Sequence, residues 1–193
     1  MTHSARFSYP VFLDLTDVPV LVVGAGPIGA RKAEALHEAG ARVRVVATAV
    51  GDTLDRERYD DVRERPFRAD DLDGMRLVIT ATGDSDVDAA VSAAARGRGI
   101  WTNAADQPID CEFILPAITR AGRVTVAVST DGASPALAKA VRDRVAAMLG
   151  DEVAALAEEL AKARTAVKAH GGSTEDVDWS PTIERVLGGV ETE

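Results

Sequence analysis

A glycine-rich segment near the start of the chain has the residue types that bind a dinucleotide. Residues 24–29 read Gly-Ala-Gly-Pro-Ile-Gly and fit the pattern G-x-G-x-x-G. Gly24 permits a tight turn, Gly26 lets the backbone approach a pyrophosphate, and Gly29 allows close packing of helix on strand. The alternative is an ordinary glycine-rich turn. We predict that the cofactor-binding residues here are Gly24, Ala25, Gly26, Pro27, Ile28 and Gly29.

Asp106 is the candidate catalytic residue. It follows a predicted strand, and in open parallel sheets the carboxyl ends of the strands line the ligand crevice. A partly buried carboxylate beside a nicotinamide could act as a general base. By position alone, a loop aspartate before Pro108 is an equally good interpretation. Thr82 and Asn103, near the ends of two predicted strands, are further cofactor-binding candidates.

The position that often distinguishes NAD from NADP carries no charged residue. About twenty residues after the glycines, many NAD-binding domains place an acid on the ribose hydroxyls. This chain has Thr48 and Ala49 there, and no arginine directly after the strand to favour a 2′-phosphate. We expect Thr48 and Ala49 to contact the cofactor, but these residues leave the choice of dinucleotide open.

A polar loop, Ser129–Pro135, precedes a predicted helix and suits a ligand carboxylate. Lys139 and Arg142 lie three residues apart on that helix and, with Arg120 and Arg123 before the loop, could form a basic patch. A plain helix cap and a solvated helix face explain the same residues equally well. The substrate-binding candidates are Ser129, Thr130, Ser134, Lys139 and Arg142.

Alternating strands and helices are predicted to position the first group of candidates. A buried strand, a helix from Pro27 to a cap at Gly40, and a second strand form a βαβ unit. The alternation continues to Ala104 and predicts a mostly parallel sheet with helices on both faces. The expected strands are Val18–Val23, Arg42–Ala47, a short one near Val62–Glu64, Leu77–Ala81 and Ile100–Ala104, and the second helix is Asp84–Gly97.

The pattern changes after Asp106. Glu112–Ile118 and Arg123–Ser129 predict a hairpin. Ser134 and Pro135 mark the start of a helix that ends at Gly150. Further helices are expected over Val153 to about Ala169 and over Pro181–Leu187. The fold class is therefore α/β: a Rossmann-type parallel-sheet domain, residues 1–112, followed by a small α+β segment, residues 113–150, and a helical C-terminal region, residues 151–193.

Composition and charge exclude several classes of protein. The 193 residues carry a net charge of −9, concentrated after Asp151, so there is no overall basic footprint for nucleic acid or anionic lipid. No apolar run approaches the ~20 residues that span a bilayer, and the first residues lack the layout of a signal peptide. We therefore expect a cytoplasmic protein. One cysteine and three scattered histidines show no ligand spacing, so no permanent metal is expected.

The ordered set of segments resembles precorrin-2 dehydrogenase, the dehydrogenase and ferrochelatase portion of siroheme synthases. The likeness runs from about Pro10 to Leu149 and includes a short strand expected at Val11–Leu15 before the glycine fingerprint. The other matching segments are Ala30-Arg31-Lys32-Ala33, Ala81-Thr82-Gly83-Asp84, Asn103-Ala104-Ala105-Asp106, Phe113–Ala117 and Val126–Pro135.

The resemblance implies NAD-dependent oxidation of precorrin-2 to sirohydrochlorin, and in many members insertion of ferrous iron to give siroheme. It implies that Asp106 takes a pyrrole N–H proton while hydride leaves a ring-bridging carbon. The many carboxylates of this tetrapyrrole suit the Ser129–Ser134 loop, Lys139 and Arg142. It also implies a homodimer whose middle segments interlock, so residues 113–150 would serve in dimerisation and substrate binding.

The chain departs from the family pattern at a few positions. Thr130 and Asp131 stand where a second serine or glycine is usual, and Thr48 replaces a proline. No methyltransferase domain is predicted, so methylation of uroporphyrinogen would need a separate protein. The alternative function is a non-catalytic NAD-sensing module, which would not need Asp106 or the polar loop. A weaker one is a chelatase or tetrapyrrole carrier without a redox role.

Overall fold

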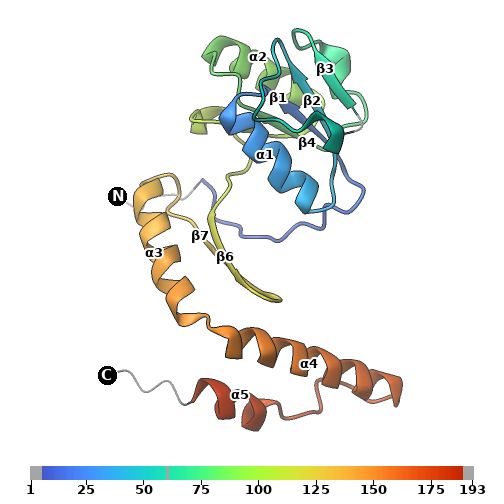
Figure 1. The fold of residues 1–193 in the computed structure, drawn as a ribbon, viewed down its shortest axis with the longest axis vertical. Coiled ribbons are helices and arrows are strands. Elements are labelled where there is room, and N and C mark those ends of the chain that lie inside the picture. Colours follow the sequence, from blue (N-terminus) through green and yellow to red (C-terminus); the bar gives the residue numbers. More distant parts are fainter. Residues whose placement is uncertain (1–5, 60, 189–193) are drawn as a thin grey trace. The chain divides into compact units, whose positions relative to one another are not determined.

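The computed structural model describes residues 6–59 and 61–188, which divide into two compact units between Leu115 and Pro116 (Figure 1). Residues 1–5, which begin both the predicted first domain and the segment expected to lack a signal peptide, and residues 189–193, which end the predicted C-terminal region, lie outside the described residues. The α/β fold class is confirmed by the first unit. The three-part division of the chain stays a prediction.

The first unit is built on a parallel sheet with strand order β3-β2-β1-β4-β5. The order reverses at β1, which pairs with β2 on one side and β4 on the other, so a topological switch point lies between β1 and β4. The strands are β1 (Pro19–Val23), β2 (Arg42–Ala47), β3 (Asp61–Glu64), β4 (Leu77–Thr80) and β5 (Trp101–Ala104). Each predicted strand of this sheet is present, with ends that differ from the prediction by no more than one residue.

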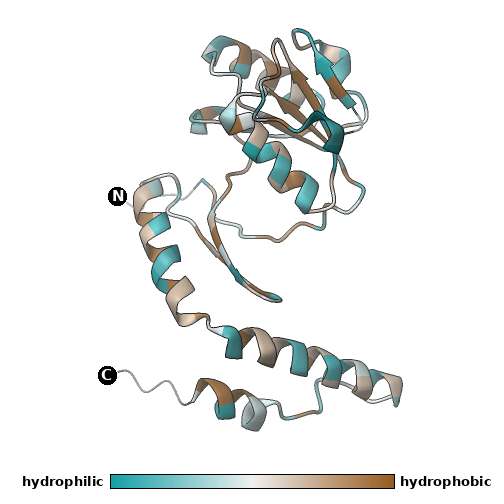
Figure 2. Cartoon of the chain, in the orientation of Figure 1, coloured by the Kyte–Doolittle hydropathy of each residue, from teal (hydrophilic) through white to brown (hydrophobic). Residues whose placement is uncertain are grey.

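Helices cover both faces of the sheet, as predicted. Successive side chains of β1 point to opposite faces and therefore meet different helices. Val20 and Val22 belong to the apolar cluster of α1 (Pro27–Glu38), whereas Leu21 and Val23 join that of α2 (Ser85–Arg96). Figure 2 shows the apolar strands at the centre of this unit. The central strand is thus buried from both sides, which explains its nearly continuous run of β-branched residues.

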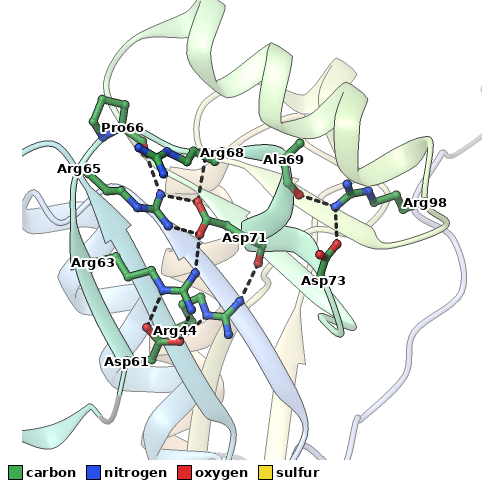
Figure 3. A network of polar contacts seen from close by, with 10 residues as sticks. All are labelled: Arg44, Asp61, Arg63, Arg65, Pro66, Arg68, Ala69, Asp71, Asp73 and Arg98. Carbon is green, nitrogen blue, oxygen red and sulfur yellow. Dashed lines mark hydrogen bonds and ion pairs between the residues drawn. The ribbon is translucent and has the colours of Figure 1, made fainter.

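A network of arginines and acids fixes β3 at the edge of the sheet (Figure 3). Asp71, in the short 3-10 helix η2 (Ala69–Leu72), is 0% exposed and accepts hydrogen bonds from Arg65 at 2.6 and 2.8 Å and from Arg63 at 2.8 Å. Arg63 and Arg44 in turn pair with Asp61 on β3. Burial opposes ionisation of Asp71, but its hydrogen bonds to Arg65, the Arg68 N–H and Arg63 outweigh burial and hold its pKa at about 2.

One predicted strand is absent, and the first strand of the predicted hairpin is shifted along the chain. The segment Val11–Leu15 pairs with no strand, since both edges of β1 are already taken by β2 and β4, and Phe12 there is 74% exposed. The first strand of the hairpin begins at Ala117 rather than Glu112. Residues 112–116 are held instead by contacts with β5, including a hydrogen bond of 2.8 Å that the Glu112 N–H donates to the Thr102 carbonyl.

The second unit contains a two-stranded antiparallel sheet and three helices. Gly122, with φ of +54°, forms the hairpin turn with Arg123. The elements are β6 (Ala117–Ala121), β7 (Val124–Val128), α3 (Pro135–Met148), α4 (Asp151–Ala169) and α5 (Ser180–Leu187). Over the described residues of this unit, only Ala138 and Leu156 are buried hydrophobic residues. The unit therefore has very little core of its own.

Two 3-10 helices, η1 (Arg56–Arg58) and η3 (Pro108–Asp110), complete the first unit. Among the residues that the structure describes, no helix combines the length and the apolar character needed to cross a membrane.

Candidate functional site

The carboxyl ends of β1, β4 and β5 bring the predicted cofactor and catalytic residues together. Val23, Thr80 and Ala104 are neighbours in the sheet register. Immediately beyond them, the Ala81 N–H donates to the Val23 carbonyl at 2.8 Å, and the Ala105 N–H donates to the Thr80 carbonyl at 2.9 Å. Three chain segments, ending in Gly24, Thr82 and Asp106, therefore meet at one edge of the sheet, where ligands of such sheets bind.

The three glycines of the fingerprint have different surroundings. Gly24 has φ of +104°, and a Cβ there would lie 2.3 Å from the Ala81 carbonyl oxygen. A Cβ on Gly29 would lie 2.1 Å from the Gly24 oxygen, whereas one on Gly26 would meet nothing within 4 Å. Gly24 and Gly29 are thus required by packing. Gly26 instead leaves its outer side open for a ligand to reach the backbone.

The N-terminus of α1 fits the pyrophosphate of a dinucleotide. Its cap residue, Gly26, provides no side-chain hydrogen bond, and its first turn contains no acid. By contrast, α2 is capped by Asp84, which accepts from the N–H groups of Asp86 and Val87. The first N–H groups of α1 and the positive end of its dipole can therefore receive phosphate oxygens.

The remaining cofactor candidates surround this turn. Gly26, Pro27 and Ile28 are exposed, Ala25 is buried, and Thr48 and Ala49 are exposed just beyond β2. A cavity of about 330 Å³ borders Pro27 and lies against α1; its lining residues are Pro27, Ala30, Arg31, Glu34, Thr53, Asp55 and Tyr59. A larger cavity of about 570 Å³ includes Pro19 and Arg42 at the starts of β1 and β2, and thus lies at the opposite edge of the sheet. The glycine turn and the catalytic candidate Asp106 share the edge of the sheet that lies away from this larger cavity.

Asp106 lies two residues beyond the end of β5 and has a left-handed backbone, φ +61°, which is unusual for a residue other than glycine. Such conformations are unfavourable and occur often at functional sites. The side chain is exposed, so the expectation that it is partly buried is wrong for this chain. It stands on a short turn between β5 and η3, where no neighbouring layer covers it.

The segment after Asp106 is firmly anchored. The Arg6 guanidinium donates to the carbonyls of Pro108, Ile109 and Cys111 at 2.7 to 3.0 Å. Asn103, a cofactor candidate, is buried, and its side-chain amide donates to the Phe113 carbonyl at 3.0 Å. Asn103 thus helps to fix the chain that carries Asp106, and its contact with the cofactor stays a prediction.

Cys111 belongs to the same anchor. Its Sγ accepts from the Ala104 N–H at 3.2 Å and lies 3.3 Å from the Ala104 carbonyl. Burial raises the pKa of this thiol. The Glu112 carboxylate accepts from the Thr102 N–H, and the Glu112 N–H donates to the Thr102 carbonyl. Together with Cys111, these contacts cover the free edge of β5 and protect it from pairing with another strand.

Lys32 is a residue of this site that the sequence analysis did not select. It lies half-buried on α1. Its pKa is lowered, first by burial and then by the positive charge of the neighbouring Arg31, while the charges of Asp106 and Cys111 act in the opposite direction. Asp106 therefore has a cationic neighbour on α1, the helix that follows the glycine turn. Sequence reasoning could have selected Lys32 because, in Ala30-Arg31-Lys32-Ala33, this lysine stands beside the alanines of the helix face.

The substrate candidates lie in the second unit. The Thr130 hydroxyl donates to the Ser134 carbonyl at 3.0 Å and accepts from the Ser134 N–H at 3.1 Å, and the Ser134 hydroxyl caps α3 by accepting from the Leu137 N–H. The Ser129 hydroxyl accepts from the Asp131 N–H. These hydroxyls shape a loop in which Asp131 and Gly132 both have positive φ.

The two cations following this loop differ in their partners. Lys139 is exposed, whereas Arg142 pairs with Asp143 at 2.6 Å. In the hairpin turn, Arg123 pairs with Glu158 at 2.6 Å. The predicted basic patch is thus partly neutralised. Within the described parts of the chain, no group of three or more His, Cys, Asp or Glu side chains is arranged to hold a metal ion.

Two family models match the chain. One, described as putative NAD(P)-binding, matches residues 11–117, and the other, described as the central part of sirohaem biosynthesis proteins, matches residues 122–148. The first covers more than half of the chain. The boundary between the two matches lies close to the division between the two structural units.

Curated relatives and a solved structure point the same way. A siroheme synthase from Methylococcus capsulatus is 42% identical over 163 residues, which are 82% of this chain and 34% of that protein. A siroheme synthase from Pseudomonas entomophila is 40% identical over 194 residues, 95% of this chain and 42% of that protein. The chain thus spans about a third to two fifths of these relatives' length. The solved structure of SirC, a precorrin-2 dehydrogenase, superposes with a TM-score of 0.69 at 26% identity, covering 95% of this chain and 89% of SirC.

Proposed function

This chain belongs to the NAD(P)-binding family that includes precorrin-2 dehydrogenases and the corresponding part of siroheme synthases, and we propose that it oxidises precorrin-2 to sirohydrochlorin with NAD. The observation that carries the proposal is the placement of Asp106. This carboxylate stands in a left-handed conformation at the same sheet edge as the glycine turn. A non-catalytic NAD sensor would not need a carboxylate held there, and none of the relatives described above is named as one.

NAD is held by the glycine turn. The N-terminus of α1 and the open side of Gly26 would hold the pyrophosphate, and Thr48, Ala49 and Thr82, just beyond β2 and β4, would hold the rest of the dinucleotide. Bound NAD supplies the acceptor for a hydride. The protein's own task is to hold the macrocycle beside it and to manage the proton that the substrate also loses.

Asp106 performs the proton transfer. Conversion of precorrin-2 to sirohydrochlorin removes two hydrogens, one as hydride from a ring-bridging carbon and one as a proton from a pyrrole N–H. Hydride loss creates positive charge on the macrocycle, which a nearby carboxylate stabilises and then relieves by accepting the proton. Lys32 on α1 places a positive charge in the neighbourhood of Asp106.

The substrate's acetate and propionate groups bind the second unit. The loop from Ser129 to Ser134 offers backbone N–H groups and the N-terminus of α3, and Lys139 supplies an exposed positive charge. Arg142 contributes once its pairing with Asp143 is exchanged for a substrate carboxylate. Ferrous iron is proposed as a second substrate, with Asp106 accepting pyrrole protons that the metal displaces.

The proposed assembly is a homodimer formed through residues 113–150. One face of α3 carries Leu137, Val141 and Met148 exposed to solvent, the last at 72%. Because the second unit buries so few apolar residues, its hairpin and α3 need a further apolar surface to be stable. A second copy of the chain supplies one by symmetry. The reaction is proposed to take place in the cytoplasm.

The test is anaerobic conversion of precorrin-2 with NAD by the purified protein. Sirohydrochlorin and NADH should appear together in the visible and near-ultraviolet spectrum. Asp106→Ala should abolish turnover and still bind NADH. NADH binding without any oxidation by the wild type would favour the sensor instead, and full turnover by Asp106→Ala would remove this residue from the mechanism. Addition of ferrous ion to sirohydrochlorin measures the chelatase reaction separately.

A further inference from the structure

Asp88 is a buried acid for which the proposed reaction has no role. It lies in the first turn of α2, and its residue is 2% exposed. Burial of a carboxylate is unfavourable unless hydrogen bonds compensate it. Capping of α2 does not require it, because Asp84 already accepts from the N–H groups of Asp86 and Val87 at 3.0 and 3.3 Å. Its position needs another explanation.

The hydrogen bonds of Asp88 all go to the end of β4. Its Oδ1 accepts from the Thr82 N–H at 3.1 Å, from the Thr82 hydroxyl at 2.8 Å and from the Thr80 hydroxyl. One carboxylate oxygen on α2 thus holds two alternate residues at the end of β4, Thr80 through its hydroxyl and Thr82 through its N–H and its hydroxyl. The contact joins a helix to the loop that borders the cofactor crevice.

That strand end touches both halves of the site. On one side, a Cβ on Gly24 would lie 2.3 Å from the Ala81 oxygen, so the Thr80–Thr82 backbone packs directly on the glycine turn. On the other side, the Thr80 carbonyl accepts from the Ala105 N–H at 2.9 Å, next to Asp106. A displacement of this strand end would change the shape of the crevice at both points.

We propose that Asp88 is a positioning residue, which fixes Thr80–Thr82 from α2 and thereby forms the dinucleotide crevice before the cofactor arrives. The inference rests on the proposed NAD-dependent function. A crevice formed in advance binds more tightly, because the ordering of its walls does not oppose binding. Loss of Asp88 should therefore weaken dinucleotide binding more than it slows a turnover that starts from the bound state.

The experiment compares Asp88→Ala with wild type and with Asp86→Asn, which changes an exposed acid in the same helical turn. NADH is titrated and its fluorescence gives Kd. We expect Asp88→Ala to raise Kd by about 10- to 100-fold, the size of one or two charge-assisted hydrogen bonds, and Asp86→Asn to leave it unchanged. The KM for NAD should rise in parallel, whereas kcat at saturating NAD should fall by less than about threefold.

A second variant keeps the test decisive if Asp88→Ala fails to fold. Thr80→Val removes one hydroxyl donor to Asp88 at a buried position that is not a proposed cofactor contact, so Kd for NADH should rise by about 3- to 10-fold. Unchanged Kd in this variant, or in a folded Asp88→Ala, would overturn the positioning role. If Asp86→Asn weakened NADH binding equally, the effect would come from the loss of negative charge in the first turn of α2, and the positioning role of Asp88 would be overturned as well. A wild-type protein that does not bind NADH would instead contradict the proposed function.

Discussion

Asp71→Asn should destabilise the first unit by about 2 kcal/mol at neutral pH. The lowering of the Asp71 pKa from 3.8 to about 2 corresponds, at about 1.4 kcal/mol for each unit, to that amount. The side chain is 0% exposed, so little solvent screens these bonds. The amide keeps the shape of the carboxylate but cannot neutralise Arg63 and Arg65.

The effect should depend on pH in a defined direction. Because the folded-state pKa lies below the unfolded value, Asp71 stabilises the fold above about pH 4 and loses this contribution as pH falls from about 4 to 2. The difference in unfolding free energy between wild type and Asp71→Asn should therefore shrink over that interval. Wild-type stability alone cannot be used, since the other acids titrate in the same range.

Urea unfolding provides the measurement. Trp101 begins β5 and reports on the sheet, and a Trp179→Phe background removes the second tryptophan, which lies in the other unit. Asp70→Asn is the matched control, because Asp70 is the exposed neighbour of Asp71. Equal stability of the Asp70 and Asp71 variants at pH 7, or a difference that is independent of pH, would refute the assigned role of the arginine network.

Four further outcomes are expected. Gly29→Ala should destabilise the fold by about 2 kcal/mol or more, because its Cβ would lie 2.1 Å from the Gly24 oxygen, and urea unfolding measures this. Gly26→Asp should leave the melting temperature nearly unchanged, since a Cβ there meets nothing within 4 Å. It should weaken NADH binding by about 100-fold or more in a titration, because it places a negative charge beside the phosphates. Ser134→Ala should remove the cap of α3 at a cost of about 1 kcal/mol in thermal unfolding, and an unchanged midpoint would contradict the capping role. The double substitution Leu137→Glu and Val141→Glu should shift the proposed dimer to monomer in analytical ultracentrifugation; a dimer that persists would place the interface elsewhere.

Much of the first unit could be predicted because local signals there agree with the tertiary structure. The apolar run of β1, the glycine turn and the alanine face of α1 all specify a βαβ unit, and the structure contains it with nearly the predicted ends. The roles of Gly24 and Gly29 also follow from sequence, since their spacing reflects contacts within this unit. Asp84 and Ser134 were marked as the starts of helices by residue type, and both cap them.

The errors lie where pairing partners decide the outcome. Val11–Leu15 and Glu112–Pro116 have the residue types of strands but remain unpaired in the sheet, because the edges they would need are occupied or are covered by side chains. Residue type alone cannot show this, since a strand exists only with a neighbour. The exposure of Asp106 was mispredicted for the same reason: it depends on which layers surround the end of β5.

The amino-acid sequence by itself determined most of the elements, the glycine turn and the position of the candidate base after β5, because these depend on contacts between residues near one another in the chain. Only the tertiary structure decided which distant groups act on them. Asp71 in η2 gains its low pKa from Arg65, the Arg68 N–H and Arg63, Lys32 meets the charge of Asp106, and Asp88 reaches Thr80 and Thr82 across the junction of helix and sheet. Hydrogen bonds and charges act over a few ångströms in space, whatever the separation along the chain, so these partners become visible only once the chain is folded.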